Sequence, residues 1–133
     1  MLDIDHFKTI NDTYGHAAGD QTLQVLGNIL RTAFREGDHV YRMGGEEFLV
    51  ILPGVEAATA ALRLNHLRET VENIQLPFEG LSVHITLSIG ISVYPNNGAT
   101  LDDLINKADK ALYKAKDAGR NRVFCFEESQ IRI

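Results

Sequence analysis

Two acidic residues near the start of the chain, Asp3 and Asp5, are of a type that could do chemistry, if another carboxylate faces one of them. They alternate with Leu2 and Ile4, and this alternation predicts the end of a strand with both carboxylates on one face. Carboxylates without a basic partner repel one another, so such a group is stable chiefly when a hard cation lies between its members. Asp3 is therefore a candidate for one side of a cation site.

A second acidic pair, Glu46 and Glu47, follows the dipeptide Gly44-Gly45. Gly-Gly between two strand-like segments suits a tight hairpin turn, and it lets the backbone approach a phosphate where a side chain would clash. If the hairpin neighbours the first strand, Asp3 and Glu46 can face one another. Magnesium suits that pair, because it is typically held by one or two carboxylates and by substrate phosphates. The alternative is an ordinary hairpin followed by solvated glutamates.

Asn11 and Asp20 suit the recognition of a guanine base. They lie on either side of a break in the helical pattern at 14–16. A carboxylate accepts hydrogen bonds from the adjacent N1–H and N2–H groups of guanine, whereas adenine would present its N1 acceptor to it. Asp20 is therefore a candidate guanine reader, with Asn11 completing the edge. The alternative is that Asp20 caps a helix and that Asn11 is a turn residue.

Lys116 and Arg120 flank Gly119 at the end of a helical pattern. They could supply cations for a triphosphate, the arginine through its forked guanidinium and the lysine as a point charge. The alternative is that both complement the helix dipole at its C-terminal end.

Positioning these residues requires alternating strands and helices, which the hydrophobic periodicity predicts. We expect strands at 2–5, 39–42, 47–52, 83–91 and 122–126, helices at 6–12, 20–34, 58–71 and 101–118, and a loop at 77–80. This order predicts one α+β domain over 1–133, with a mostly antiparallel central sheet and flanking helices. Its core is ferredoxin-like, the palm fold of nucleotide polymerases and nucleotidyl cyclases. Many unrelated proteins share that fold, so the fold alone does not decide the function.

Composition narrows the class of protein. The net charge of −5 argues against nucleic acid as the main partner, because phosphate-backbone binding needs a basic surface. No apolar run approaches the roughly 18 residues of a membrane-spanning helix, so we expect no membrane contact from this segment. The lone Cys125 cannot form an internal disulfide, which favours the cytoplasm. A nucleotide remains open as a ligand, since it needs only local cations and amides.

Taken together, the motifs resemble the GGDEF family of diguanylate cyclases, in a Gly-Gly-Glu-Glu-Phe form. The resemblance covers essentially the whole chain and lies in seven stretches, at residues 3–8, 11–16, 19–20, 42–48, 88–90, 108–113 and 115–121.

The resemblance implies a role for each matching residue. Asp3, the carbonyl of Ile4 and Glu46 are expected to bind Mg²⁺ or Mn²⁺. The catalytic glutamates are Glu46 and Glu47; Glu47 is a further metal ligand or assists deprotonation of the ribose 3′-hydroxyl, and which glutamate does which stays open. The expected substrate contacts are Gly45 at the α-phosphate, the backbone of Phe7 and Lys8 at the terminal phosphates, Lys116 and Arg120 at the triphosphate, and Asn11 with Asp20 at guanine.

The implied reaction joins two GTP molecules into cyclic di-GMP with release of pyrophosphate, by metal-assisted phosphoryl transfer. One domain holds one GTP and the product is two-fold symmetric, so the implied active unit is a homodimer.

An inhibitory product site is also implied. Arg35 and Asp38 match the family's Arg-x-x-Asp motif, with Arg35 expected at phosphate or guanine and Asp38 at the Watson–Crick edge. The family often adds an arginine from the next helix; the nearest position in this chain is His66, with Arg63 and Arg68 close by. The alternative is an ordinary surface helix end.

One departure is that the family normally begins with a helix ahead of the first strand, which this chain lacks, so we expect an N-terminally truncated domain. Three rival functions stay open. They are a catalytically silent module that binds nucleotide or cyclic di-GMP, a nucleotidyl cyclase with another product, and a ferredoxin-like interaction domain.

Overall fold

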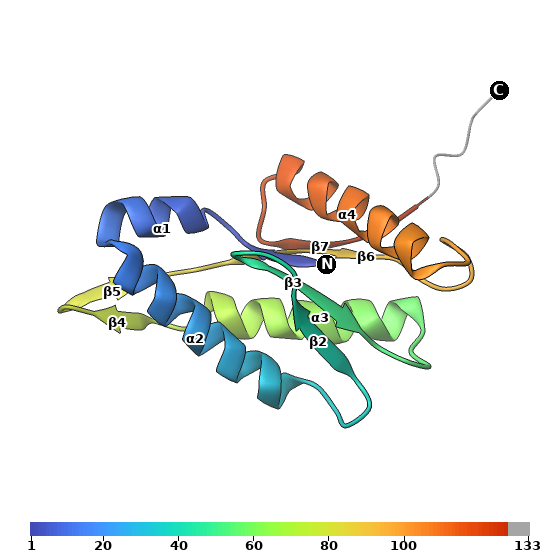
Figure 1. Cartoon of the computed structure of the whole chain (residues 1–133), viewed down its shortest axis with the longest axis horizontal. Helices are drawn as coiled ribbons and strands as arrows, with labels where there is room; N and C mark the ends of the chain where they lie inside the picture. The colour runs from blue at the N-terminus through green and yellow to red at the C-terminus, as the bar shows by residue number, and fades with distance from the viewer. Residues whose placement is uncertain (128–133) are drawn as a thin grey trace.

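The computed structural model describes residues 1–127, which form an α+β domain as predicted (Figure 1). The last part of the predicted domain, residues 128–133, lies outside the described residues. The elements, in chain order, are β1 (Leu2–Ile4), α1 (Phe7–Tyr14), α2 (His16–Ala33), β2 (His39–Arg42), β3 (Glu47–Ile51), α3 (Ala57–Glu72), β4 (Leu76–Phe78), β5 (Leu81–Val83), β6 (Leu87–Ile91), α4 (Leu101–Asp117) and β7 (Arg122–Cys125).

The central sheet has five strands in the order β2-β3-β1-β6-β7. Strand β1 lies in the middle and runs antiparallel to both β3 and β6. Strands β6 and β7 are parallel, because α4 connects them as a crossover helix. The sheet is therefore mostly antiparallel, as the sequence predicted.

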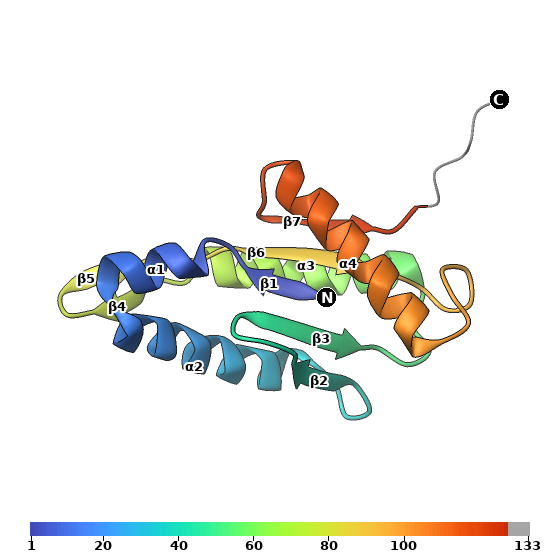
Figure 2. The same ribbon diagram turned by 45° about the horizontal axis from the view of Figure 1, so that its top comes forward.

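The two faces of the sheet carry different clusters. Leu2, Ile4 and Phe48 point to the face covered by α2 and α3, where the main hydrophobic core lies. The alternate residues of the same strands point to the face covered by α4, where Leu49 joins a smaller cluster with Leu112 (Figure 2). Asp3 and Asp5 share this second face, since alternate residues of a strand point the same way.

Helix α4 lies directly against the backbone of β6 at Gly90. A Cβ at that position would lie 2.2 Å from the carbonyl oxygen of Ala108 and 2.2 Å from the backbone nitrogen of Leu112. The helix begins at a Thr100 cap whose hydroxyl accepts a hydrogen bond from the Asp103 N–H at 3.1 Å. This close approach carries the last turn of α4 to the end of β1, where the acidic residues lie.

Two sequence predictions about the elements were wrong. Helix α2 begins at His16 rather than at Asp20, because the chain turns at Gly15 (φ 92°) and re-enters helical geometry at once. The expected strand over 83–91 is interrupted, and 76–83 forms a separate β4–β5 hairpin. Glu79 and Gly80, with φ of 48° and 78°, make the turn of that hairpin, and positive φ at both central residues is typical of the tightest hairpin turns.

No helix within residues 1–127 is long and apolar enough to cross a lipid bilayer.

Candidate active site

The structure brings the two acidic pairs together at one end of the sheet. Asp3 on β1 is paired with Glu47 on β3 in the antiparallel register, so their side chains share a face. The Ile4 N–H donates to the Glu46 carbonyl at 3.2 Å. In a strand the N–H and C=O of one residue point to the same side, so the Ile4 carbonyl also faces the hairpin. Asp3, Ile4, Glu46 and Glu47 are therefore adjacent, as the sequence predicted.

Asp3 is a buried carboxylate with one unpaired oxygen. Its side chain is 5% exposed; Oδ2 pairs with the Lys116 ammonium, whereas Oδ1 has no hydrogen-bond partner in the described structure. Burial raises the pKa of Asp3 above its usual value; Lys116 opposes this shift, and Glu46 and Glu47 add to it. Lys116 was predicted to contact the triphosphate. In the structure its ammonium is bonded to Asp3, a predicted metal ligand.

The donor set at this place suits a hard divalent cation. It consists of carboxylate and carbonyl oxygens, which Mg²⁺ and Mn²⁺ prefer, and the unpaired Asp3 Oδ1 is an acceptor that lacks a donor. Within residues 1–127, however, no three His, Cys, Asp or Glu side chains converge closely enough to hold a metal by themselves. The fit therefore rests on Asp3 and Glu46 together with a backbone carbonyl.

The hairpin tip is held by Arg42, which the sequence analysis did not single out. Its Nε donates to the Gly44 carbonyl at 3.1 Å and its Nη2 to the Gly45 carbonyl at 2.8 Å. Both carbonyls are thereby turned toward the arginine. A Cβ at Gly45 would meet nothing within 4 Å, so a phosphate can approach the backbone there. The one available signal was an arginine two residues ahead of the paired glycines.

The predicted guanine residues lie on α1 and α2, which pack against each other. A Cβ at Gly19 would lie 1.8 Å from the Asn11 Oδ1, so the glycine makes room for the amide of Asn11. Asp20 follows Gly19 and is exposed on α2. It does not cap the helix, since Gly15 precedes its first residue. Its carboxylate is accordingly free of the capping role that was the alternative.

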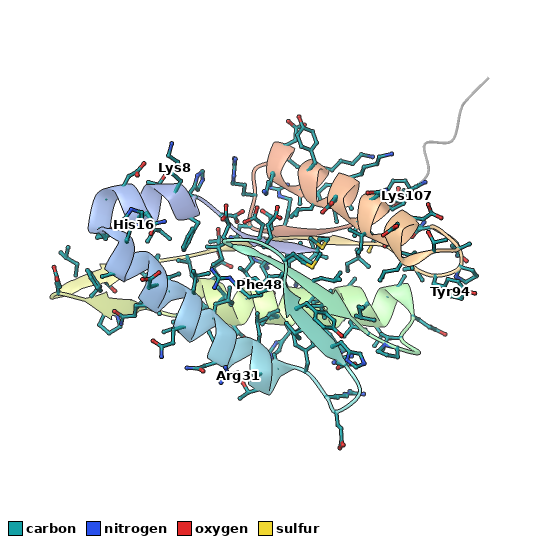
Figure 3. All side chains as sticks on the ribbon, viewed as in Figure 1. Lys8, His16, Arg31, Phe48, Tyr94 and Lys107 are labelled. Carbon is teal, nitrogen blue, oxygen red and sulfur yellow. The ribbon has the colours of Figure 1, made fainter. Side chains whose placement is uncertain are left out.

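Phe7 and Lys8 form the first turn of α1. No side chain in the described structure caps that turn, which follows His6 in a left-handed conformation. Backbone N–H groups of an uncapped first turn can bind an anion. The Lys8 side chain projects outward from α1 (Figure 3).

The predicted inhibitory motif lies on the loop between α2 and β2. Asp38 accepts hydrogen bonds from the Arg35 N–H at 2.9 Å and from the Arg63 Nη2 at 2.7 Å, and the Arg63 guanidinium lies 6.0 Å from the centre of the Phe34 ring. The Arg63 hydrogen bond, foremost, lowers the pKa of Asp38. His66 is exposed on α3 and makes no side-chain bond to this motif within 1–127. The arginine nearest the motif from α3 is thus Arg63.

Comparisons with known proteins agree with the motifs. The family model described as "Diguanylate cyclase, GGDEF domain" matches residues 1–122. Diguanylate cyclase A of Treponema denticola is 43% identical over 123 residues, which are 92% of this chain and 33% of that protein. Diguanylate cyclase DgcP of Pseudomonas aeruginosa is 42% identical over 123 residues, which are 92% of this chain and 18% of that protein. The chain therefore spans a third or less of these relatives.

Solved structures show the same fold. The GGDEF domain of DgcB from Caulobacter crescentus, in complex with c-di-GMP, superposes with a TM-score of 0.89 at 35% identity, over 96% of this chain and 75% of that chain. The active GGEEF domain of a diguanylate cyclase from Vibrio cholerae gives a TM-score of 0.84 at 35% identity, over 96% and 81%. Because the family match spans the first strand, the hairpin tip and the end of α4 together, the chain belongs to the diguanylate cyclase GGDEF-domain family, as its motifs predicted.

Proposed function

We propose that this domain condenses two GTP molecules into cyclic di-GMP and pyrophosphate. The observation that carries the proposal is the buried Asp3, whose unpaired Oδ1 lies beside two glutamates. Lys116 compensates the charge of this buried carboxylate only in part. Burying it costs folding free energy, so such a group is expected where function requires it. The family of the chain supports the same reaction.

Asp3, the carbonyl of Ile4 and Glu46 would hold the divalent cation, Mg²⁺ or Mn²⁺, with Glu47 beside them. A cation bound there neutralises charge on the phosphates and makes the attacking hydroxyl more acidic. In the reaction the 3′-oxygen of one GTP bonds to the α-phosphorus of the other, and the bond to the β-phosphate oxygen breaks. Glu46 or Glu47 receives the hydroxyl proton.

The remaining site residues would bind the nucleotide. The guanine edge would be bound by Asn11 and Asp20, and the α-phosphate would lie at Gly45. The terminal phosphates would be bound by the amides of Phe7 and Lys8, and the triphosphate by Lys116 and Arg120. Lys116 can reach both Asp3 and an incoming phosphate, because its ammonium is a compact charge on a flexible stem. Each domain binds one GTP, so two domains meet in a symmetric homodimer.

Product inhibition is part of the proposal. Asp38 is held by the Arg63 guanidinium and by the Arg35 backbone N–H. The Arg35 guanidinium takes no part in these two bonds, so it would serve the phosphates or guanine of cyclic di-GMP. The c-di-GMP complex of the DgcB domain supports a product-binding role within the family.

The test is product analysis by mass spectrometry after incubation with GTP and Mg²⁺. We expect cyclic di-GMP from the wild-type protein. Glu46→Gln should reduce formation by about 10³-fold or more, since it removes a charge that acts on the transition state, while GTP still binds. Full activity in Glu46→Gln would refute the metal assignment. Binding of cyclic di-GMP without any turnover would favour the silent sensing module instead.

A further inference from the structure

Two consecutive residues after α4 have a backbone conformation that L-residues seldom adopt. Arg120 and Asn121 have φ of 64° and 47°, both in the left-handed region. The Arg120 N–H donates to the Ala115 carbonyl at 2.9 Å and the Gly119 N–H to the Lys116 carbonyl at 3.2 Å, as at many helix C-termini. At a helix C-terminus usually a single glycine has positive φ. Arg120 and Asn121 follow Gly119 with positive φ as well, so their strained backbone must be stabilised by other interactions.

That support comes from Asn121, whose polar side-chain atoms are both bonded. Its Nδ2 donates to the Glu72 Oε1 at 2.9 Å, and its Oδ1 accepts from the Arg68 Nη1 at 2.8 Å. Arg68 and Glu72 also pair with each other at 2.9 Å. The two α3 residues thus form a bracket of fixed donor and acceptor that fits an amide side chain.

The backbone of Asn121 is held from the opposite side by Asp5. The Asn121 N–H donates to the Asp5 Oδ2 at 3.0 Å. The same carboxylate accepts from the Thr86 hydroxyl at 2.7 Å and from the Ser88 hydroxyl at 2.6 Å. Both oxygens of Asp5 are therefore occupied by donors. Asp5 is buried directly after β1, two residues from Asp3.

We propose that Asn121 is a positioning residue for Arg120. Bonded to Arg68 and Glu72 on α3 and to Asp5 directly after β1, it fixes the left-handed backbone that directs the Arg120 guanidinium to the triphosphate of GTP. The proposal rests on the proposed function, in which Arg120 contacts the triphosphate. Since Asp5 follows β1 and lies two residues from Asp3, the same bonds fix Arg120 relative to the acidic residues.

The hydrogen bond between Asn121 and Glu72 can be tested by exchanging the amide at position 121 with the carboxylate at position 72. Asn121→Asp puts a carboxylate oxygen against the Glu72 carboxylate, and the two repel. Adding Glu72→Gln restores the bond, because the new amide at position 72 donates to the new carboxylate at position 121. Arg68 keeps an acceptor on both residues. The net charge of the bracket is then the same as in the wild-type protein.

Binding is measured by calorimetry with Mg²⁺ and 3′-deoxy-GTP, which lacks the attacking hydroxyl, and with GMP, which lacks the terminal phosphates. We expect Asn121→Asp to weaken 3′-deoxy-GTP binding about tenfold while GMP binding stays within about twofold, because misplacing one phosphate ligand affects the triphosphate alone. The double variant should recover most of the loss. Glu69→Gln, which removes a charge beside Arg68 on the same helix, should change neither affinity.

A second variant covers the case in which Asn121→Asp fails to fold. Asn121→Gly accepts a left-handed φ without strain but lacks both side-chain bonds, and it should show the same selective loss. An unchanged 3′-deoxy-GTP affinity in Asn121→Asp or Asn121→Gly, an equal loss of GMP affinity, or no recovery in the double variant would overturn the positioning role. Wild-type protein that binds no 3′-deoxy-GTP and makes no cyclic di-GMP would instead overturn the proposed function.

Discussion

At the scale of the residue, Asp3 is a proposed metal ligand whose burial as a charged group destabilises the fold. Burial, together with Glu46 and Glu47, raises its pKa above the usual 3.8, and Lys116 offsets this only in part. The folded state therefore binds the Asp3 proton more tightly than the unfolded state does. It follows that Asp3 lowers the free energy of unfolding as the pH rises from 3.8 through the folded-state pKa.

We expect Asp3→Asn to abolish turnover and yet to stabilise the fold. At pH 7 the free energy of unfolding should rise by about 1 kcal/mol, because a neutral amide replaces a buried charge. The gain should shrink toward pH 4, where Asp3 itself becomes protonated. Urea denaturation at both pH values measures it, with the exposed Asp12→Asn on α1 as a control that should show no such trend. A less stable Asp3→Asn protein at pH 7 would contradict this account of the site.

Gly19 offers a test of the guanine site. In Gly19→Ala the new methyl group displaces the Asn11 amide, whose oxygen would lie 1.8 Å away. We expect affinity for 3′-deoxy-GTP to fall about tenfold, with poorer discrimination against the adenine analogue, since one polar contact to the base edge is lost. Gly27→Ala on the same helix meets nothing within 4 Å and should stabilise the helix by about 0.5–1 kcal/mol without affecting binding. Equal affinities in the two variants would remove Asn11 from the site.

Site residues could be predicted from the sequence where their type alone indicates a chemical role. Residues whose role depends on which side chains they bond to could not. Asp3 and Glu46 could be paired because one strand and one hairpin suffice to bring them together. Arg42, Arg63 and Asn121 were not assigned roles, because a polar side chain in a single sequence does not show its partner. Asn121 bonds to residues that lie 49 and 53 positions away in the sequence. These residues come together only when the sheet has formed.

At the scale of the element, α4 determines the distance between the acidic residues and the predicted triphosphate cations. The backbone of the helix packs directly against the backbone of β6 at Gly90, so the helix cannot move closer to the sheet there. We expect Gly90→Ala to destabilise the domain by about 3 kcal/mol, since the methyl group meets backbone atoms that cannot rotate away. Urea unfolding followed by circular dichroism measures the change, with Gly27→Ala as the matched glycine control. A Gly90→Ala protein of wild-type stability would mean that α4 can shift freely on the sheet.

Elements were predictable where the pattern is local. The β2–β3 hairpin and α4 appear within a residue or two of their predicted bounds, because alternation and a 3.6-residue period are properties of neighbouring residues. The start of α2 was misplaced because Asp20 is a good cap by type, although Gly15 had already ended the preceding helix. The β4–β5 hairpin was missed because its turn uses Glu79 at positive φ, an uncommon residue for that conformation.

At the scale of the whole molecule, α3 connects the predicted inhibitory motif with the loop that carries Arg120. Arg63, near the middle of the helix, bonds to Asp38, and Arg68, just over one turn later, bonds to Asn121. One helix therefore contacts both the inhibitory motif, just before the edge strand β2, and the loop before the other edge strand, β7.

This arrangement predicts which α3 residue serves product inhibition. Arg63→Ala should raise the concentration of cyclic di-GMP needed for half-inhibition about tenfold, since a charge-assisted contact is lost, and Arg35→Ala should do the same. His66→Ala should leave inhibition unchanged. Inhibition curves with added cyclic di-GMP measure the effect. A large effect of His66→Ala together with none for Arg63→Ala would restore the assignment expected from the family pattern.

The central position of β1 has a consequence for how the chain folds as it is synthesised. Leu2 is paired with Phe48 on one side and with Ile89 on the other, so the first strand of this sheet to be synthesised is complete before either of its neighbours. Most of the sheet joins residues far apart in the chain, and such contact order slows folding. Nascent chains that end before β6 should hold β1 with one edge exposed, open to proteases, chaperones and mispairing until about two-thirds of the domain has emerged.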